Sequence, residues 1–371
     1  MTTTYEIRLS SDSGTLLATI DRFTGLQYAL LANDVSACVV KLTGDIDKTM
    51  FAVDRRLEIW RQAEGGPLLQ EGVWFIRKIK DSTDNNGVRL IEVTGYSPNY
   101  LLSSRIVAYN AGSAQAEIVT TALDNMMKTV VLQNLSTGAT DTARTISTTY
   151  LGIQQSVAAA PVASKAFARR NVLTVLQDLA DASRGAGTEL YFDMVPIDTV
   201  KFEFRTYVNL PGIDHTFPNG NPPVFVGLEF GNLSEPSVEL DYSGEYTFVY
   251  GAGQGEEDDR VLGNAEDTAR SGRSIFARRE GFADAREQTT STGVSSKAYE
   301  LLAERRPRLR FSGRILSVPG SLYGVHWRHG DRVSAVYYGQ QYDALVRSVE
   351  VSVTEDGEEN ISTRLETDDA N

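Results

Sequence analysis

The sequence has a single cysteine, Cys38, among its 371 residues, so it cannot form an internal disulfide and no zinc site can be built around it. Cys38 lies in an apolar predicted strand, where a buried and inert thiol is expected. No apolar run approaches the ~20 residues of a membrane-spanning helix. Glu6 and Arg8 stand where a secretion signal needs an apolar core. The chain must therefore be stabilised by packed cores and interfaces.

Basic residues are also in short supply, since 36 Lys and Arg oppose 49 Asp and Glu to give a formal net charge of −13. An acidic chain does not hold phosphate backbones by counterion release, which disfavours a sequence-specific DNA- or RNA-binding protein. Anionic membrane surfaces would also repel it. Hydrophobic residues at 41% and charged residues at 23% are ordinary for a globular chain of two or three domains.

No catalytic, cofactor-binding or metal-binding constellation is predicted. The stretch 251–255 is rich in glycine and follows a predicted strand, but it lacks the Lys-Ser/Thr of a phosphate loop, and four carboxylates (256–259) follow it directly. We interpret it as a structural loop, and the acidic run as a solvated loop without calcium-binding spacing. His326, His329 and Asp331 would form a metal site only with a further ligand that the sequence does not reveal. We predict that the chain is not an enzyme.

The first hundred residues alternate apolar and polar side chains in short runs, which predicts strands at 5–9, 15–20, 37–42, 56–61, 73–79 and 88–94. Asp84-Asn85-Asn86-Gly87 is predicted to be a hairpin loop because Asn and Gly tolerate positive φ. This pattern favours a small β-barrel or sandwich.

Helical periodicity begins after residue 110, where Ser113 is a candidate N-cap. The helix that it would start carries one apolar face, made of Ile118, Val119, Ala122, Leu123 and Met126. A second helix is predicted over 172–183 and a third over 296–306, ended by Pro307. Further strands are predicted at 189–195, 200–207, 224–230 and 246–250 and from Leu309 to the end, with a Pro- and Gly-rich linker over 209–223.

Two segments of the chain, 54–95 and 331–365, resemble each other. Arg77 and Gly87 are separated by ten residues, as are Arg347 and Gly357, and the strand before each arginine is apolar. Upstream, the segment that starts at Asp54 aligns with the one that starts at Asp331. We predict one strand–strand–hairpin unit used twice, with the glycines in the turns.

The repeat also predicts side-chain directions. Because alternation fixes the face that each side chain takes, Ile76 and Val346 should point into their cores, and Arg77 and Arg347 should point away from them. Two copies are too few for a solenoid but suit a ring in which each chain contributes two similar wedges.

The string Val93-Thr94-Gly95-Tyr96-Ser97, followed by Leu101-Leu102-Ser103-Ser104-Arg105, closes the first predicted barrel. Near the C-terminal end, Tyr323-Gly324-Val325-His326-Trp327-Arg328-His329-Gly330-Asp331-Arg332-Val333 leads into a strand–turn–strand ending. Together these segments resemble the tail hub, or baseplate hub, proteins of long-tailed bacteriophages, especially the short form in siphovirus tail tips.

The resemblance implies a mainly β fold with two tube-like β-barrel domains and inserted α+β and helical segments. The implied division is 1–105, first tube-like barrel; 106–208, inserted α+β domain; 209–255, linker and first strands of the second barrel; 256–308, mixed helical insertion; 309–371, remainder of the second barrel.

The resemblance also implies a function and partners. The chain would be a structural virion protein at the tail tip, assembled in the host cytoplasm as a homotrimeric ring that adapts a six-fold tube to a three-fold tip. Its partners would be the distal tail ring or tail tube protein, the tape-measure protein and tail fibre or tip proteins. Genomic DNA would pass through the lumen without specific binding, since an acidic conduit does not attract a polyanion.

Two other classes of function stay open. A β-rich carbohydrate-active hydrolase could use a carboxylate pair among the 49 acidic residues. A carbohydrate- or receptor-binding module could use the 16 Tyr and three Trp for stacking. Trp60, Trp74 and Trp327 lie in or beside predicted strands, however, where packing is the commoner use of tryptophan.

Overall fold

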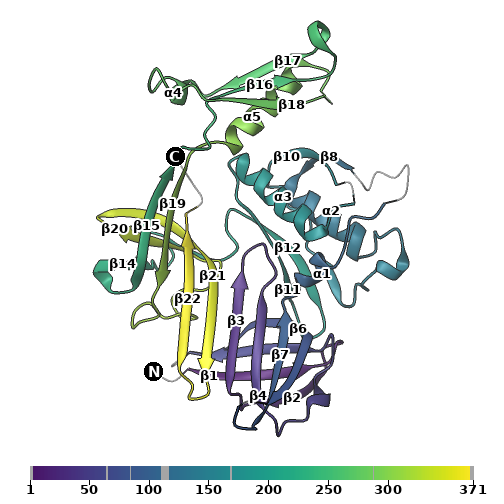
Figure 1. Cartoon of the computed structure of the whole chain (residues 1–371), viewed down its shortest axis with the longest axis vertical. Coiled ribbons are helices and arrows are strands. Elements are labelled where there is room, and N and C mark those ends of the chain that lie inside the picture. Colours follow the sequence, from purple (N-terminus) through teal and green to yellow (C-terminus); the bar gives the residue numbers. More distant parts are fainter. Residues whose placement is uncertain are drawn as a thin grey trace.

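The computed structural model describes residues 3–63, 66–83, 85–109, 117–167, 169–286 and 288–367, and the chain is mainly β (Figure 1). The strands of the first two hundred residues are β1 (Thr4–Ser10), β2 (Leu16–Ile20), β3 (Gly25–Leu31), β4 (Ala37–Thr43), β5 (Arg56–Gln62), β6 (Leu68–Thr83), β7 (Arg89–Tyr96), β8 (Glu117–Ala122), β9 (Leu151–Ile153), β10 (Val162–Ala166) and β11 (Leu190–Pro196). The later strands are β12 (Phe202–Val208), β13 (Asp214–His215), β14 (Phe225–Gly227), β15 (Leu233–Asp241), β16 (Phe248–Ala252), β17 (Leu262–Glu266), β18 (Glu280–Asp284), β19 (Arg308–Ile315), β20 (Arg332–Tyr337), β21 (Gln340–Thr354) and β22 (Glu359–Glu366). The helices are α1 (Tyr100–Ser103), α2 (Leu123–Leu135), α3 (Val172–Gly185), α4 (Thr268–Ser271) and α5 (Ser291–Glu304).

One 14-stranded sheet joins the two ends of the chain, in the order β15-β19-β22-β21-β3-β4-β7-β6-β5-β1-β2, with β20 branching from β21 to pair with β13 and β14. In Figure 1 the yellow strands β21 and β22 lie beside the purple strands β3 and β4. Among the described residues this sheet is open and does not close into a barrel. The prediction of mainly β structure is therefore confirmed, whereas two separate barrels are not seen in the single chain.

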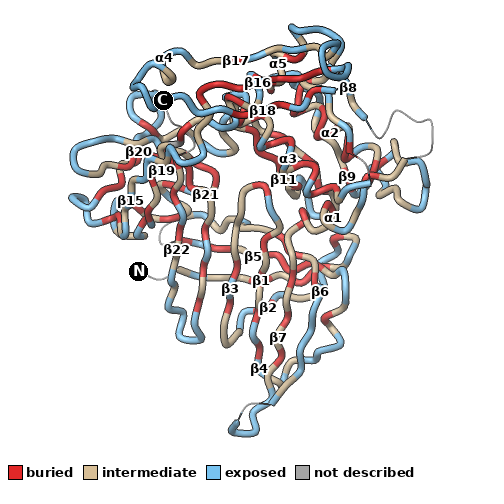
Figure 2. The backbone as a smooth tube through the Cα atoms, turned by 45° about the horizontal axis from the view of Figure 1, so that its top comes forward, coloured by how far each residue is buried: buried red, intermediate tan, exposed pale blue. Residues whose placement is uncertain are grey.

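Alternating side chains of this sheet form its core. Leu26, Val40, Ile91 and Val351 are at most 2% exposed and come from four different strands. Trp74 and Trp327 are each 1% exposed in the same cluster. Burial of these side chains follows from the period-two pattern, because one face of each strand is apolar. Figure 2 shows the buried stretches in red where the strands meet.

A second cluster of buried side chains packs α2 and α3 against β11 and β12. The helix over 172–183 is confirmed: α3 begins after Asn171, whose side chain accepts a hydrogen bond from the Thr174 N–H. The strands at 189–195 and 200–207 are also confirmed, with Phe202 and Phe204 buried on one face of β12.

The helix predicted from Ser113 is wrong at its start. Ser113 lies outside the described residues, and Ile118 and Val119 belong to β8, which pairs with β10. The run of β-branched residues before Ala122 favours a strand, because such side chains lose freedom in a helix. The helix, α2, begins at Leu123 and keeps Met126 buried.

A third, smaller unit consists of β16 flanked by β17 and β18, with α5 packed on it at the top of Figure 1. The predicted third helix is confirmed, although α5 begins at Ser291, where the Thr290 side chain accepts a hydrogen bond from the Gly293 N–H. The strand predicted over 224–230 is reduced to β14, and β3 and β15 were not predicted. In the described part of the chain, no helix combines the length and apolar character that crossing a membrane requires.

Candidate assembly interface

The long strand β21 changes partner half-way along its length. Up to Leu345 it pairs with β20, and from Ser348 to Thr354 it pairs with β3, which belongs to the first part of the chain. Its other edge pairs with β22 from Leu345 to Val353. This change of partner is what joins the N-terminal and C-terminal strands into one sheet.

The predicted repeat is present at the level of individual residue pairs. Every Cα pair of β6 with β7 has a counterpart in β21 with β22 at residue numbers higher by 270, for example Ile79 with Val93 and Val349 with Thr363. Both hairpins skip one residue at the same place, between Ile76 and Lys78 in the first and between Val346 and Ser348 in the second. Such a shared bulge is a specific feature that pattern similarity alone would not produce.

The skipped residues are Arg77 and Arg347, the two arginines that the sequence aligned. Arg77 pairs with Asp54 at 2.5 Å, and Arg347 pairs with Glu366 at 3.1 Å. The residues before them, Ile76 and Val346, are both 0% exposed, as predicted.

The turns also agree with the prediction. Gly87 and Gly357 have φ values of +84° and +79°, a conformation that glycine adopts at little cost. Asp84, which the sequence placed in the first loop, lies outside the described residues.

The upstream alignment needs a correction of one residue. The Asp54 N–H donates to the Ile76 carbonyl as the Gly330 N–H donates to the Val346 carbonyl, so Asp54 corresponds to Gly330 and not to Asp331. Both positions have positive φ, +69° and +86°. The sequence aligned the identical aspartates, whereas the backbone conformation is what the two copies share.

The remaining strands follow the same scheme. In the first copy the order is β3-β4-β7-β6-β5, and in the second it is β15-β19-β22-β21-β20. Leu26 lies opposite Val40 as Leu233 lies opposite Ile315, and all four are buried. The chain thus contains one five-stranded unit twice, and β21 of the second unit holds β3 of the first.

Two strand edges in this scheme have no partner among the described residues. β6 pairs with β5 only up to Phe75, so the edge from Arg77 to Thr83 that corresponds to the β3-binding edge of β21 is open. β15, the counterpart of β3, pairs with β19 alone. An open edge exposes unpaired N–H and C=O groups and favours pairing with another chain.

A cluster of buried polar side chains links the two five-stranded units. Arg61 donates from Nε to Oε1 of Glu359 at 2.8 Å, and from Nη1 to the carbonyl of Tyr323 at 3.0 Å. Tyr5 donates to the same Glu359, and Tyr323 donates to Glu71. Burial, reinforced by the nearby carboxylates, raises the pKa values of Tyr5 and Tyr323, and burial raises the pKa of Glu71. Sequence reasoning missed this cluster.

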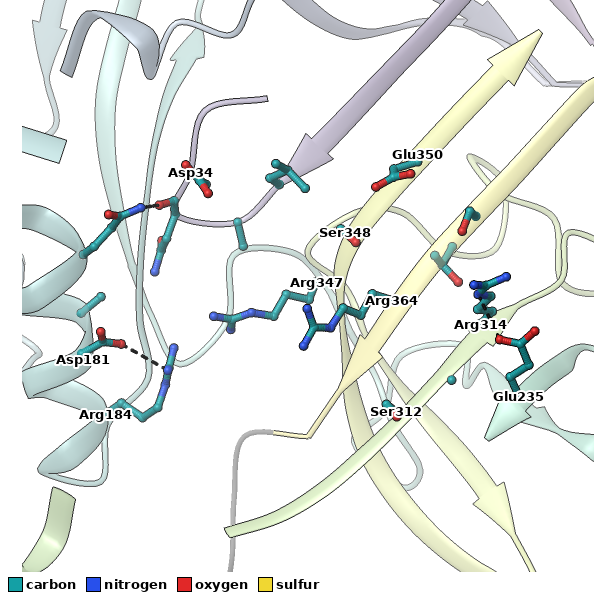
Figure 3. A pocket seen from close by; sticks show the side chains of 18 of the residues that line it. Asp34, Asp181, Arg184, Glu235, Ser312, Arg314, Arg347, Ser348, Glu350 and Arg364 are labelled. Carbon is teal, nitrogen blue, oxygen red and sulfur yellow. Dashed lines mark hydrogen bonds and ion pairs between the residues drawn. The ribbon is translucent and has the colours of Figure 1, made fainter. Parts of the chain in front are cut away.

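A hollow of about 850 Å³ lies between the sheet and α3 (Figure 3). Arg347 and Arg364 extend from the sheet toward it, and Asp181 and Arg184 line it from α3. Its lining mixes both signs of charge. Each arginine has a carboxylate partner: Arg184 pairs with Glu189 at 3.1 Å, Arg314 with Glu235 at 3.5 Å, and Arg347 and Arg364 with Glu366 at 3.1 and 3.9 Å.

The histidine-containing segment does not gather into a site. The His326 Nδ1 accepts a hydrogen bond from the Leu322 N–H, whereas the His329 ring contacts the Arg347 carbonyl at 3.2 Å. Burial lowers the pKa of His329 to about 4. Asp331 accepts hydrogen bonds from the backbone N–H groups of Ile213 and Arg328, and no three metal-ligating side chains cluster within the residues described.

The other candidates from the sequence have structural surroundings. Gly251 and Gly253 pack so closely against α5 that an added Cβ would come within 2.6 Å of Val294 in both cases, and the acidic run after them is exposed. Cys38 is fully buried, as expected. Trp74 and Trp327 are in the core, and Trp60 lies beneath Arg8, whose guanidinium carbon is 4.2 Å from the ring centroid.

Residues 6–365 match the family described as siphovirus ReqiPepy6 Gp37-like protein. The chain belongs to this family. No curated protein sequence matches it. Solved structures show the same fold at low sequence identity: the 43 kDa tail protein of prophage MuSo2 from Shewanella oneidensis has a TM-score of 0.55 and 12% identity, with 98% of both chains covered. The tail protein from Neisseria meningitidis has a TM-score of 0.55 and 10% identity over 98% of this chain and 97% of that one.

A third similar structure, prophage tail protein gp18 from Listeria monocytogenes, has a TM-score of 0.51 and 11% identity over 98% of this chain and 94% of that one. A chain of a PdpA-VgrG complex from Francisella has a TM-score of 0.54 and 8% identity, with 98% of this chain but 58% of that chain covered. The chain is therefore a phage tail-type protein in family and in fold, and the resemblance drawn from its sequence is confirmed at that level.

Proposed function

We propose that the chain is a structural, non-enzymatic component of the phage tail tip, and that three copies form its hub ring. The observation that carries the proposal is the five-stranded unit that occurs twice in one open sheet. Such a chain contains one junction between its two units, where β21 holds β3. Its two open strand edges, on β6 and β15, are the two complementary sides of a second junction of the same kind. Copies added head to tail then produce a closed ring when the rotation between them closes.

Three copies contribute six similar units, the number that a six-fold tail tube or distal tail ring requires as a neighbour. The partners that we propose are therefore that tube or distal ring, the tape-measure protein and the tail fibre or tip proteins. In this arrangement the two five-stranded units are the tube-like wedges. The segments 106–208 and 256–308 are insertions that decorate the ring, which forms in the host cytoplasm and ends up in the virion.

The proposed lumen is lined by the hydrophilic face of the sheet. Pairing places Lys41 opposite Glu92, and Glu350 opposite Ser362, on this face. The face is thus of mixed charge instead of acidic, which differs from the simplest expectation for a conduit. The arginines around the hollow are already bound to carboxylates, so DNA would pass without a continuous row of free cations to hold its phosphates.

Purified tails of the phage that encodes this chain test the proposal. Quantitative mass spectrometry should find three copies per tail, and an antibody against the chain should label the tail tip. Six copies per tail, or tails that assemble and infect normally without the gene, would overturn it.

A further inference from the structure

Inside the chain, the edge of β21 from Ser348 to Thr354 holds β3. We infer that the corresponding open edge of β6 holds β15 of a second copy of this chain, in the same antiparallel register. The inference rests on the proposed ring, and it adds the strands and residue pairs that would make each junction between copies.

The internal junction fixes the register. Leu31 lies opposite Ser348 and Leu30 opposite Val349. Lys78 is the counterpart of Ser348, because Lys78 lies opposite Thr94 as Ser348 lies opposite Arg364. In the same way Ile79 is the counterpart of Val349, since the two lie opposite Val93 and Thr363 respectively.

The counterparts of Leu31 and Leu30 in β15 follow from its pairing with β19. Ser312 in β19 corresponds to Ala37 in β4, because Ser312 lies opposite Glu366 as Ala37 lies opposite Tyr96. Glu366 and Tyr96 are themselves at matching positions of the two hairpins. Ser237 faces Ser312 and so stands in the place of Ala29. Val238 and Glu239 then stand in the places of Leu30 and Leu31.

The resulting pairs are complementary. Lys78 of one copy lies opposite Glu239 of the next, and both side chains are exposed in the single chain. Ile79, which is 36% exposed, lies opposite Val238, which is only partly buried. Opposite charges and paired apolar side chains across antiparallel strands each stabilise the pair by about 0.2–1 kcal/mol. A slip of one residue would place Lys78 opposite Leu240 and lose both matches.

The edge of β15 has one interruption. Glu235, with φ of +50°, and Pro236 lie between Ser234 and Ser237, where the pairing with β19 shifts by one residue. Proline cannot donate to a ladder, so the pairing is expected to be continuous from Ser237 onward and to resume beyond the bulge. Lysines and bulges also protect edges that stay unpaired, and the experiment separates that role from pairing.

Cysteine cross-linking of the full-length chain tests the register. Lys78→Cys and Glu239→Cys in the same chain should form intermolecular disulfides on mild oxidation and yield a covalent trimer, in purified tails and in concentrated solution. The Leu31–Ser348 pair lies beside the hydrogen bond from the Ala32 N–H to the Arg347 carbonyl, so it is a non-hydrogen-bonded pair with Cα atoms about 4.5 Å apart. Leu31→Cys with Ser348→Cys is therefore the reference, and it should close within one chain.

The matched control, Lys78→Cys with Leu240→Cys, places the second thiol on the opposite face and should give no trimer. Cys38 does not compete, because it is fully buried. Equal or better cross-linking of the control pair overturns the register. Tails that contain three copies but show no cross-link at either pair overturn the edge pairing and leave the ring intact. A chain that is absent from tails overturns the proposed function itself.

Charge reversal gives a second measurement that does not depend on thiol geometry. Lys78→Glu should weaken trimer assembly by about two- to five-fold for each junction, because like charges then face each other. Adding Glu239→Lys in the same chain should restore assembly. Lys297→Glu, on α5 and therefore on neither of the two open edges, should leave assembly unchanged. Failure of the double reversal to restore assembly would contradict the pairing.

Discussion

Arg61 and Glu359 form an ion pair of 2.8 Å between strands that are 298 residues apart in the sequence, with side chains only 3% and 14% exposed. The pair joins β5 of the first unit to β22 of the second. Because the Arg61 guanidinium also binds the Tyr323 carbonyl, it fixes the loop before β20 to the same place. Two kinds of contact therefore hold the two units together: the strand pairing of the sheet, and this buried polar cluster.

Removal of Arg61 should destabilise the protein more than removal of one partner of an exposed ion pair. Arg61→Ala leaves Glu359 buried without its cation, which typically costs about 3–5 kcal/mol. Lys297→Ala, which removes an exposed pair on α5, should cost less than about 0.5 kcal/mol. Urea denaturation measures the stability of both variants. Equal midpoints would show that the Arg61–Glu359 ion pair does not contribute to the stability of the protein.

Stability should depend on pH through two groups with opposite signs. Burial lowers the pKa of His329 to about 4 and raises that of Asp193 to about 6. Below pH 6.5 the unfolded state binds a proton at His329 before the folded state does, so this group removes stability as the pH falls toward 4. Between pH 6 and 4 the folded state binds a proton at Asp193 first, so that group adds stability as the pH falls.

Two variants separate these contributions. His329→Gln should make the protein relatively more stable than the parent as the pH falls from 6.5 to 4, by roughly 1–3 kcal/mol. Asp193→Asn should do the reverse between pH 6 and 4. Urea midpoints measured across this range decide the matter, and parallel pH profiles for both variants and the parent would contradict the assignment.

The turn glycines of the two hairpins should respond alike. Gly87→Ala and Gly357→Ala meet no neighbouring atom within 4 Å, so each should cost only the strain of positive φ, about 1–2 kcal/mol. Gly244→Ala is the control, since it also meets open space but has no positive φ. Thermal unfolding should show two similar losses and an unchanged control. A loss at one hairpin alone would show that the two turns are not equivalent.

The paired arginines predict weak affinity for DNA. The parent chain should not retain a short duplex at about 0.15 M salt, because counterion release needs free cations. Glu366→Gln removes one carboxylate partner of Arg347 and Arg364 and should raise the affinity for DNA in a salt-sensitive way at low ionic strength. Glu355→Gln, in an exposed turn, should not. Fluorescence anisotropy of a labelled duplex would measure DNA binding by the parent chain and by both variants. Binding by the parent chain at about 0.15 M salt would contradict the proposed conduit.

The hairpins could be predicted from the sequence because each depends on local features: alternation around Ile76 and Val346, and a glycine at the turn. β15 could not, because Pro236 in its middle normally argues against a strand. Its edge position and its bulge are what make the proline acceptable. β8 was missed because Ile118 and Val119 also fit one face of a helix, and only its pairing with β10 decides between the two.

The features closest to function are long-range. Nothing in the neighbourhood of Arg61 indicates Glu359, since a strand arginine is usually exposed. The change of partner along β21 depends on where β3 arrives from the other end of the chain. The sequence predicted the repeat itself through Arg77 and Arg347, but it aligned Asp54 with Asp331, because identical letters outweigh a shared backbone conformation when only letters are visible.

The internal junction between β21 and β3 has a consequence for how a ring could acquire its size. In the proposed ring, every second junction is already built when a chain folds, so each newly folded chain carries a finished arc with a set curvature. Assembly then needs only to repeat that arc, and copies that meet at a different angle would fail to close. The curvature that sets the diameter of the ring is thus built into each folded chain before it meets any partner.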